Sequence, residues 1–525
     1  MASMDVAAIV AEGDGAYRLR PQSVGLTMRT GLSTIRHKMR FAVVPELAAQ
    51  PLRRRRWRAG SVFAVLIALG IGAALSGGAR AADVKGLDPF HDVDPFPSTY
   101  RPAPSPAVAI VHATIFTGAG TEIRNGTVIL KDGKIAAVGP GVKPPDGVRA
   151  IDGTGMWMTP GIVDPHSHLG DFPAPAVKGT IDVNEKTNPD TAEVWAENSV
   201  WPQDPGFDRA RAAGVTTLQI LPGSANLFGG RTIVLKNVPA TTVQAMKFPG
   251  APYGLKMACG ENPKGDYGGH GRFPMTRMGE FAGYREAWIE AAEYLHKWKV
   301  YERKVENGES ASPPKRDLRL DTLAGVLEGK IRPQIHCYRA DEMANMIDVA
   351  KEFGYQIAAF HHAVEAYKIP EILKKNNICA IVWGGGRWGF KMEAYDGVAE
   401  GAAILQQAGV CVAIHSDSSV LIQHLPERAA IAIAAGRKIG INIPEAVAVE
   451  WFTLNPARIL GIADKVGSLE VGKDADVVLW NKNPFSIYAT PAKVFIDGAL
   501  VYDRANPAIN HQSDFEVGQV RGAQP

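Results

Sequence analysis

Short apolar runs alternate with longer amphipathic stretches through the middle of this 525-residue chain. Runs of this length, bounded by glycine, proline or polar residues, predict buried strands. The predicted strands are residues 161–164, 215–221, 232–236, 254–259, 332–337, 356–361, 378–383 and 410–415. Stretches in which apolar residues recur every three or four positions predict helices, among them 341–353, 363–376, 396–408 and 425–438. Eight strand–helix units predict an α/β fold, a (β/α)8 TIM barrel over residues 159–455, with a doubly wound open sheet as the alternative.

A two-residue alternation flanks this region on both sides. Residues 107–158 contain strand patterns joined by Asn-Gly and Asp-Gly turns, and residues 456–505 contain further strand patterns around another Asp-Gly turn. Neither group has enough strands to bury a core alone, so we expect one small β-sandwich domain built from both ends of the mature chain. A Pro-rich linker (residues 82–106) precedes this domain, and a C-terminal tail (residues 506–525) follows it.

The segment between the fourth and fifth predicted strands, residues 265–318, is too long for one simple connection. Its alanine- and charge-rich part predicts a helix over about 279–306. This insertion either covers the mouth of the barrel or decorates its surface.

The first 81 residues differ from the rest, because they hold 12 Lys+Arg and only 4 Asp+Glu. An arginine cluster ends at Arg58, an apolar run follows at 61–75, and the small-residue sequence Ala79-Arg80-Ala81 comes next. This order is typical of a secretory signal peptide. A single membrane anchor is the alternative, but the run is shorter than the roughly 20 residues that a span needs. We therefore expect cleavage near Ala81 and a periplasmic or secreted protein with no stable membrane anchor after cleavage.

Setting the leader aside changes the charge of the protein. The whole chain carries +3, but residues 82–525 hold 45 basic and 50 acidic residues, a net charge of about −5. A mildly acidic body argues against nucleic-acid binding, so we expect a small-molecule substrate and no nucleic-acid partner, with a homo-oligomer left open. The cysteines lie in or beside apolar runs, without CxxC spacing, at Cys259, Cys337, Cys379 and Cys411. We interpret them as buried small hydrophobes rather than as a disulfide framework.

Side chains that bind metals follow several predicted strands at the ends where barrel enzymes place their active sites. His166 and His168 end the first strand, and residues two apart in a strand point to the same side. His336 ends the fifth strand, His362 follows the sixth, and Asp417 follows the eighth. Imidazole and carboxylate groups are common ligands of divalent metals. The sequence therefore predicts a metal site at the C-terminal ends of the strands.

Two segments carry a resemblance to a known family. Residues 159–168 (TPGIVDPHSH) and residues 467–479 (GSLEVGKDADVVL) resemble the amidohydrolase superfamily, specifically its imidazolonepropionase-like branch, which includes Xaa-Pro dipeptidases. The resemblance covers roughly residues 107–505. It implies a TIM barrel with a closing β-domain and a metal-dependent hydrolase of C–N bonds.

The resemblance also implies roles for the strand-end residues. His166 and His168 would bind one divalent metal, and His336 and His362 would help to bind a second, with zinc the expected ion. Asp417 would serve both as a metal ligand and as the catalytic residue. A divalent metal lowers the pKa of bound water from 15.7 towards about 7, and a carboxylate beside that water can take its proton and pass it to the leaving nitrogen. Capping of the following helix is the alternative role for Asp417.

The ligand that bridges the two metals is open, because family members use either a carboxylated lysine or a glutamate. Lys256 lies inside the fourth strand, where a buried lysine without a partner is costly. Glu261 follows the strand in a turn that can aim a carboxylate inward, so we favour Glu261 as a metal ligand and keep Lys256 as the alternative. His361 and His362 cannot share one strand face, and the family pattern selects His362. His415 is expected to support the site without binding the metal.

Substrate contacts are expected from residues near these ligands. Tyr338 and Arg339 closely follow the fifth strand, and Trp388 lies in a glycine-rich loop after the seventh. Arg339 either binds a substrate carboxylate or pairs with Asp341. We expect an exported metal-dependent amidohydrolase whose metal-bound hydroxide attacks a C–N bond of an amide, cyclic amide or dipeptide. A heterocycle deaminase with the same metal site is the alternative. A non-catalytic barrel scaffold is less favoured, because the ligand set is complete.

Overall fold

The computed structural model describes residues 86–87, 94–385 and 391–513, and all of them belong to one compact unit. The predicted signal peptide, the cleavage site near Ala81 and the candidate Trp388 lie outside the described residues. Within the described ranges, every helix is too short or too polar to cross a membrane.

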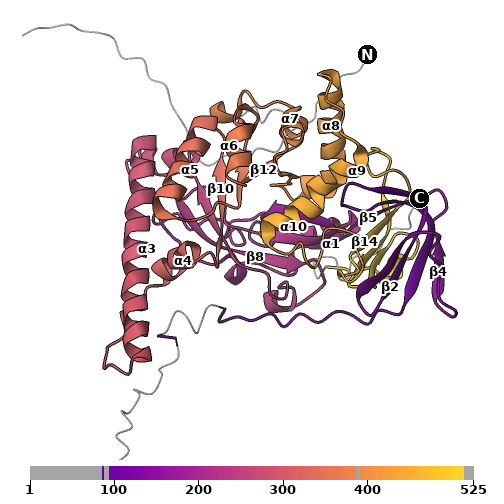
Figure 1. Ribbon diagram of the computed structural model, residues 1–525, viewed down its shortest axis with the longest axis horizontal. Helices are drawn as coiled ribbons and strands as arrows, with labels where there is room; N and C mark the ends of the chain where they lie inside the picture. The colour runs from indigo at the N-terminus through magenta and orange to yellow at the C-terminus, as the bar shows by residue number, and fades with distance from the viewer. Residues whose placement is uncertain (1–85, 88–93, 386–390, 514–525) are drawn as a thin grey trace, which may run out of the picture. The chain divides into compact units, whose positions relative to one another are not determined.

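The centre of the unit is an eight-stranded sheet that forms a nearly closed barrel (Figure 1). Its strands follow the chain order: β6 (Ile162–Ser167), β7 (Val215–Ile220), β8 (Phe228–Lys236), β9 (Gly254–Ala258), β10 (Arg332–Cys337), β11 (Ala359–His362), β12 (Cys379–Val382) and β13 (Val412–Ile414). The first and last strands meet where the Asp417 N–H donates to the His166 carbonyl oxygen at 3.1 Å. The structure is therefore a mixed α/β fold in which the eight predicted strands are present in the predicted order.

Helices surround the barrel strands (Figure 1). Those that pack directly against barrel strands are α1 (Pro205–Ala212), α6 (Pro370–Lys375), α7 (Gly401–Gln407), α8 (Leu425–Lys438) and α10 (Leu454–Leu460). Helix α5 (Ala340–Phe353) contacts α3 (Arg277–Glu306), and α9 (Glu445–Ala448) contacts α8. The predicted helices 341–353 and 425–438 are confirmed. The helix predicted at 363–376 is shorter, because α6 begins only at Pro370, and proline favours the first position of a helix.

Strand β8 departs from the expected barrel, because it runs antiparallel to both of its neighbours, β7 and β9. Only residues 221–227 join β7 to β8, and a parallel crossover needs a dozen or more residues. The described chain has no α-helix between β7 and β9. The prediction of eight equivalent parallel strand–helix units is therefore wrong at this strand, while the other neighbouring pairs are parallel.

The long connection between β9 and β10 contains three helices, α2 (Glu261–Gly268), α3 (Arg277–Glu306) and α4 (Leu318–Leu327). The helix predicted at 279–306 is thus confirmed. Its first turn is capped by Thr276, whose hydroxyl accepts the N–H of Gly279 at 3.1 Å. The buried face of α3 packs against α4 and α5, so this insertion is anchored to the barrel wall.

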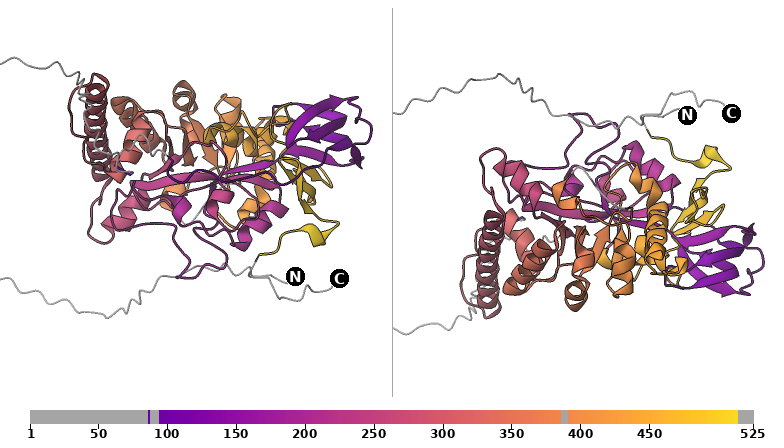
Figure 2. Two further views of the ribbon diagram at one scale, coloured as in Figure 1. Left: turned by 90° about the horizontal axis from the view of Figure 1, so that it is seen from below. Right: turned by 90° about the horizontal axis from the view of Figure 1, so that it is seen from above.

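The two ends of the described chain form a second sheet together (Figures 1 and 2). Its strands are β1 (Val108–Phe116), β2 (Glu122–Lys131), β3 (Lys134–Pro140), β4 (Arg149–Asp152), β5 (Trp157–Pro160), β14 (Val477–Trp480), β15 (Pro491–Ile496) and β16 (Ala499–Asp503). Strand β5 pairs antiparallel with β14, so both chain ends contribute to one sheet. Pairing among the described strands defines a single sheet, and a two-sheet sandwich is not confirmed.

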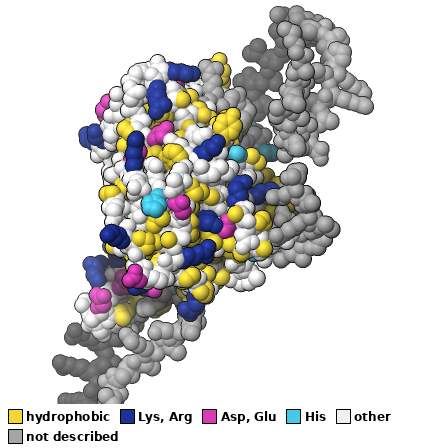
Figure 3. Space-filling view, turned by 90° about the vertical axis from the view of Figure 1, so that its right-hand side faces the viewer, with side chains coloured by type: hydrophobic (Ala, Val, Ile, Leu, Met, Phe, Trp, Pro, Cys, Tyr) yellow, Lys and Arg dark blue, Asp and Glu magenta, His cyan; other side chains and the backbone are white. Residues whose placement is uncertain are grey.

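On the face in Figure 3, Lys and Arg side chains are scattered among acidic and hydrophobic ones.

A buried lysine joins the barrel to this terminal sheet. Lys236, at the end of β8, is 1% exposed, and its Nζ lies 3.0 Å from Asp474, 3.2 Å from Asp476 and 3.0 Å from Asp497. Burial alone would lower the pKa of Lys236, but the three carboxylates outweigh it and raise that pKa. Tyr100 adds a hydrogen bond to Asp497. The network is mutually satisfied, and removing one partner would leave uncompensated charge in the interior.

The cysteines form two disulfides, Cys259–Cys337 and Cys379–Cys411. The expectation of four unpaired cysteines is therefore wrong. Each disulfide joins neighbouring barrel strands, β9 to β10 and β12 to β13, where the Cα atoms lie 5.3 and 4.6 Å apart. The partners are 78 and 32 residues apart in the sequence, so only the adjacency of the strands brings them within bonding reach.

Candidate metal centre

The strand-end histidines converge at one side of the barrel. Ring centroids are 5.1 Å apart for His166 and His168, 4.8 Å for His166 and His362, and 4.5 Å for His336 and His362. His415, which follows β13, stacks on His166 at 4.9 Å. These histidines lie at the C-terminal ends of barrel strands β6, β10, β11 and β13. Because these ends meet at one edge of the barrel, the histidines come together.

Three ligand atoms form a compact group. The Nε2 atoms of His166 and His168 are 3.4 Å apart, and Asp417 Oδ1 lies 3.4 Å from the first and 3.2 Å from the second. Ligands of a tetrahedral zinc ion at about 2.0–2.1 Å are about 3.3 Å from one another. His168 Nδ1 donates to the carbonyl oxygen of Leu221 at 2.7 Å, which leaves Nε2 as the acceptor nitrogen. The group therefore fits one divalent metal ion.

Further ring nitrogens at this edge form no hydrogen bond with the described residues. Among the described residues, both ring nitrogens of His336 and of His415 and the Nδ1 of His362 are buried without a hydrogen bond. Leaving such a group unsatisfied costs about 1–3 kcal/mol. Burial lowers the pKa of His336 and His362 well below the usual value and that of His415 to about 3, so these imidazoles stay neutral. Neutral, unpaired imidazoles are the form that binds a metal.

Comparison with known proteins identifies the family. A sequence model of the amidohydrolase family matches residues 360–501. The solved structure of an amidohydrolase from Thermotoga maritima MSB8 is 34% identical, has a TM-score of 0.69, and the match covers 76% of this chain and 100% of that one. The chain belongs to the amidohydrolase family. The resemblance expected from the sequence is confirmed.

Curated relatives of this amidohydrolase have several activities in their names. Amidohydrolase tasK from Hapsidospora irregularis is 32% identical over 72% of the chain, and the match spans only 40% of that longer protein. An imidazolonepropionase from Stenotrophomonas maltophilia is 26% identical over 71% of the chain and 89% of its own length. A 5-methylthioadenosine/S-adenosylhomocysteine deaminase from Desulforudis audaxviator is 23% identical, with 71% and 85% covered.

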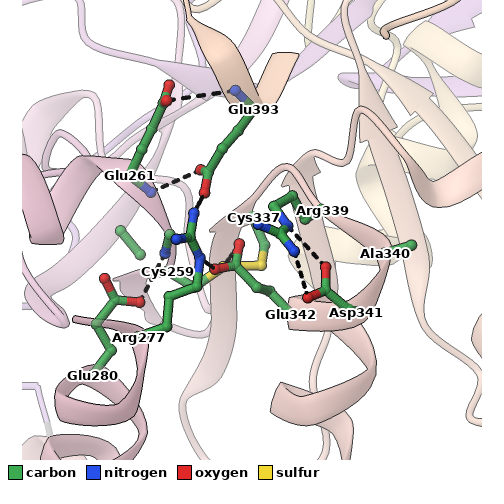
Figure 4. Close-up of a disulfide and its surroundings, with 12 residues drawn as sticks. Cys259, Glu261, Arg277, Glu280, Cys337, Arg339, Ala340, Asp341, Glu342 and Glu393 are labelled. Atoms are coloured by element: carbon green, nitrogen blue, oxygen red, sulfur yellow. Dashed lines mark hydrogen bonds and ion pairs between the residues drawn. A yellow bond between two sulfur atoms is a disulfide. The ribbon is translucent and has the colours of Figure 1, made fainter. Parts of the chain in front are cut away.

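The two bridging candidates of this amidohydrolase lie in different surroundings. Lys256, in β9, is fully buried, its Nζ donates to the carbonyl oxygen of Pro222 at 2.9 Å, and burial lowers its pKa to about 7. Burial is the largest cause that lowers the pKa of His166, and the charge of Lys256 is the second. Glu261 begins α2 and is turned to Glu393, whose N–H lies 3.5 Å from its Oε2 (Figure 4). Lys256 thus lies in the strand that pairs with the strand of His336, whereas Glu261 lies beyond that strand, beside Glu393.

Asp417 faces the histidines and not the following helix. Burial alone would raise its pKa, but the nearby imidazoles of His168, His362 and His415 outweigh burial and lower that pKa. Capping is done by Ser418, whose hydroxyl accepts two backbone N–H groups of the next turn at 3.2 Å each. Asp417 and His362 both have left-handed backbones, with φ of 52° and 64°. Such conformations cost of order 1–3 kcal/mol and are concentrated at functional sites.

Two residues behind the ligands were not assigned a role from the sequence. His361 Nε2 lies 2.6 Å from Gln334 Oε1, and its Nδ1 lies 2.8 Å from His166 Nδ1. If His361 donates to the glutamine oxygen, it accepts from His166, whose Nε2 is then free to bind a metal. Asp164 accepts the N–H groups of His166 at 3.1 Å and Ser416 at 3.3 Å. It therefore ties the first barrel strand to the segment after the last one.

Of the two described candidates for substrate binding, Tyr338 lies beside the histidines and Arg339 pairs with a neighbouring aspartate. Tyr338 is buried, and its ring lies 4.5 Å from His336 and 5.6 Å from His362. Arg339 is partly exposed and pairs with Asp341 through two hydrogen bonds of 2.9 and 2.8 Å (Figure 4), so the structure gives it the alternative role. A small pocket lies beside His362. Its lining includes Val364, Tyr367, Trp383, Val398, Ala402 and Leu405.

Proposed function

We propose that the chain is an exported metal-dependent hydrolase that cleaves a C–N bond in an amide, cyclic amide or dipeptide. The observation that carries this proposal is the group formed by His166, His168 and Asp417, whose ligand atoms lie within 3.4 Å of one another. His336 and His362 would help to hold a second ion. Zinc is the proposed metal, because imidazole nitrogens and a carboxylate form its usual ligand set.

A bound divalent metal lowers the pKa of water and polarises the carbonyl under attack. Asp417 is ionised at neutral pH and takes the proton that the nucleophilic water gives up. The same carboxyl then passes the proton to the leaving nitrogen. Asp417 is suited to both roles, because its Oδ1 faces His166 and His168 while its Oδ2 lies 3.9 Å from His362.

We propose Lys256 as the residue that joins the two ligand groups, in the form of a carboxylated lysine. With a pKa of about 7, about half of the Lys256 amine is neutral at pH 7, and only a neutral amine can add CO2. The carboxylate so formed would extend from a strand that pairs directly with the strand of His336. It would also remove the cost of a buried lysine whose one hydrogen-bond partner among the described residues is the backbone carbonyl of Pro222.

Export is the second part of the proposal. The charged, apolar and small-residue order of residues 53–81 supports it. The disulfides Cys259–Cys337 and Cys379–Cys411 support it independently, because disulfides form and persist in oxidising compartments and are rare in the cytosol.

A heterocycle deaminase is the second candidate, favoured by the deaminase relative that matches 71% of the chain. Both reactions would use the same ligands, so the experiment compares products. The mature protein, purified without chelator, is analysed for metals and assayed against N-acyl amino acids, Xaa-Pro dipeptides, cyclic amides and aminopurines. Bound zinc with amine or carboxylate release supports the hydrolase, and ammonia release from the aminopurines supports the deaminase. Less than about 0.2 equivalents of any divalent metal per chain would overturn both.

A further inference from the structure

Three buried side chains form a hydrogen-bonded chain that leads away from the candidate metal centre. His166 in β6 contacts His361 in β11, where the two Nδ1 atoms lie 2.8 Å apart. His361 Nε2 lies 2.6 Å from the Oε1 of Gln334 in β10. Each of the three side chains belongs to a residue that is at most 1% exposed. The proposed reaction uses His166 as a metal ligand and leaves Gln334 without a role.

The contacts determine where the protons of this chain lie. An amide oxygen can only accept a hydrogen bond, so the proton between His361 and Gln334 is carried by His361 Nε2. His361 is neutral, because it is fully buried and the hydrogen-bond partners of both its ring nitrogens are uncharged side chains. A neutral imidazole carries one N–H, so His361 Nδ1 is an acceptor. The proton between the two histidines therefore belongs to His166 Nδ1.

The position of that proton decides whether His166 can bind a metal ion. A metal binds the ring nitrogen that has no proton, and the hydrogen bond of the other nitrogen selects it. With the proton on Nδ1, the free nitrogen of His166 is Nε2, which lies 3.4 Å from both His168 Nε2 and Asp417 Oδ1. If the Gln334 amide faced His361 with its NH2 group, every hydrogen bond of the chain would reverse and the proton would occupy His166 Nε2.

We propose that Gln334, acting through His361, is a positioning residue that holds His166 in its metal-binding tautomer. The inference rests on the proposed function, because it takes His166 as a metal ligand. Metal-binding histidines usually donate to a carboxylate, a backbone carbonyl or water. The acceptor here is a second imidazole, which can either accept or donate. The direction of the hydrogen bonds is therefore fixed one side chain further away, at the amide of Gln334.

The test measures the tautomer of His166 in the metal-free mature protein, by nitrogen NMR with isotope-labelled histidine, and zinc affinity by competition with a chromogenic chelator. Gln334→Met (Q334M) removes the acceptor and keeps the length of the side chain. His361→Asn (H361N) places an amide oxygen near the position of Nδ1, so His166 gains an acceptor that does not depend on Gln334. The control is Gln219→Met (Q219M), which changes another buried glutamine of the barrel, whose amide bonds to a backbone carbonyl and a threonine hydroxyl.

We expect His166 to carry its proton on Nδ1 in the wild type and in Q219M. Q334M should mix the two tautomers and weaken zinc binding about tenfold, the lower end of the effect typical of residues that orient a ligand. The same substitution should cost less than about twofold when it is added to H361N, where the new amide accepts directly from His166.

A proton on His166 Nε2 in the wild type overturns the proposal. An equal loss of zinc affinity on adding Q334M to the wild type and to H361N also overturns it, because a glutamine that only stabilises the fold would act alike in both. A proton on Nδ1 that Q334M displaces, in a protein that takes up no zinc, supports the role of Gln334 and counts against the proposed hydrolase.

Discussion

Removing the disulfide Cys259–Cys337 is expected to weaken both the fold and the metal site, whereas removing Cys379–Cys411 should weaken the fold alone. The first disulfide lies at the metal-binding edge, next to His336, and the Cys259 N–H donates to the His336 carbonyl oxygen at 2.9 Å. The second joins the starts of β12 and β13, at the other ends of the strands. The two double variants C259A/C337A and C379A/C411A are therefore matched controls for each other.

The expected losses follow from the loops that the disulfides close. In the chain-entropy account, closing 78 residues stabilises the folded state by about 4.5 kcal/mol and closing 32 residues by about 3.7 kcal/mol. The two variants should thus lose similar stability, as measured by urea denaturation of the mature protein. Zinc affinity should differ, because residues that orient a ligand typically change it about 10–100-fold.

The assay is a competition with a chromogenic zinc chelator at a temperature at which both variants stay folded. We expect at least a tenfold loss of affinity in C259A/C337A and less than a twofold loss in C379A/C411A. Equal losses in the two variants would refute the reasoning, because they would trace the effect to general destabilisation. No loss of stability in either variant would refute the presence of the disulfides.

Three further predictions concern single side chains. Asp417→Asn should lower turnover about 10²–10⁴-fold, because it removes the proton acceptor, while elemental analysis should find most of the metal retained. Lys256→Met should lose at least half of the bound metal, and Glu261→Gln should keep it, as measured by the same analysis. Burial raises the pKa of Glu280 to about 7 from an ordinary value of 4.5, so the folded state binds the extra proton between these values. Stability should therefore fall by roughly 3 kcal/mol as pH rises from 4.5 to 7, and Glu280→Gln should remove this dependence in denaturation experiments across that range.

A specific result would contradict each of these three predictions. Turnover by the Asp417 variant at the wild-type rate would remove that residue from catalysis. Metal loss in the Glu261 variant, with full metal in the Lys256 variant, would reverse the bridging assignment. For Glu280, the glutamine can still accept the N–H that Gly260 donates at 3.0 Å. An unchanged pH dependence would therefore show that another group titrates.

The ligand-bearing strand ends could be predicted because strand order along the chain equals strand order in the sheet. His336 and Asp417 each follow an apolar run, and parallel strands place such residues at one edge whatever the details of packing. The direction of strand β8 was predicted wrongly, because the chain turns back after β7 and β8 runs antiparallel to it. Here the sequence did hold a signal, because the link at 221–227 is too short for a crossover.

Other features depend on contacts that span the chain. The carboxylate of Glu261 accepts the N–H of Glu393, 132 residues away, at 3.5 Å, and no local sequence pattern reports that neighbour. The expectation that His361 and His362 face opposite sides assumes a regular strand. The left-handed backbone of His362, with φ of 64°, breaks the alternation. Both rings then lie 4.8 Å from the ring of His166.

The shared terminal sheet fixes when the protein can fold during synthesis. Strand β5 leaves the ribosome more than 300 residues before its partner β14, and until then it presents an unpaired edge. Lys236 likewise awaits the carboxylates of Asp474, Asp476 and Asp497. The barrel therefore does not mature as an independent first domain, and the nascent chain gains its final structure only once the last strands have been made.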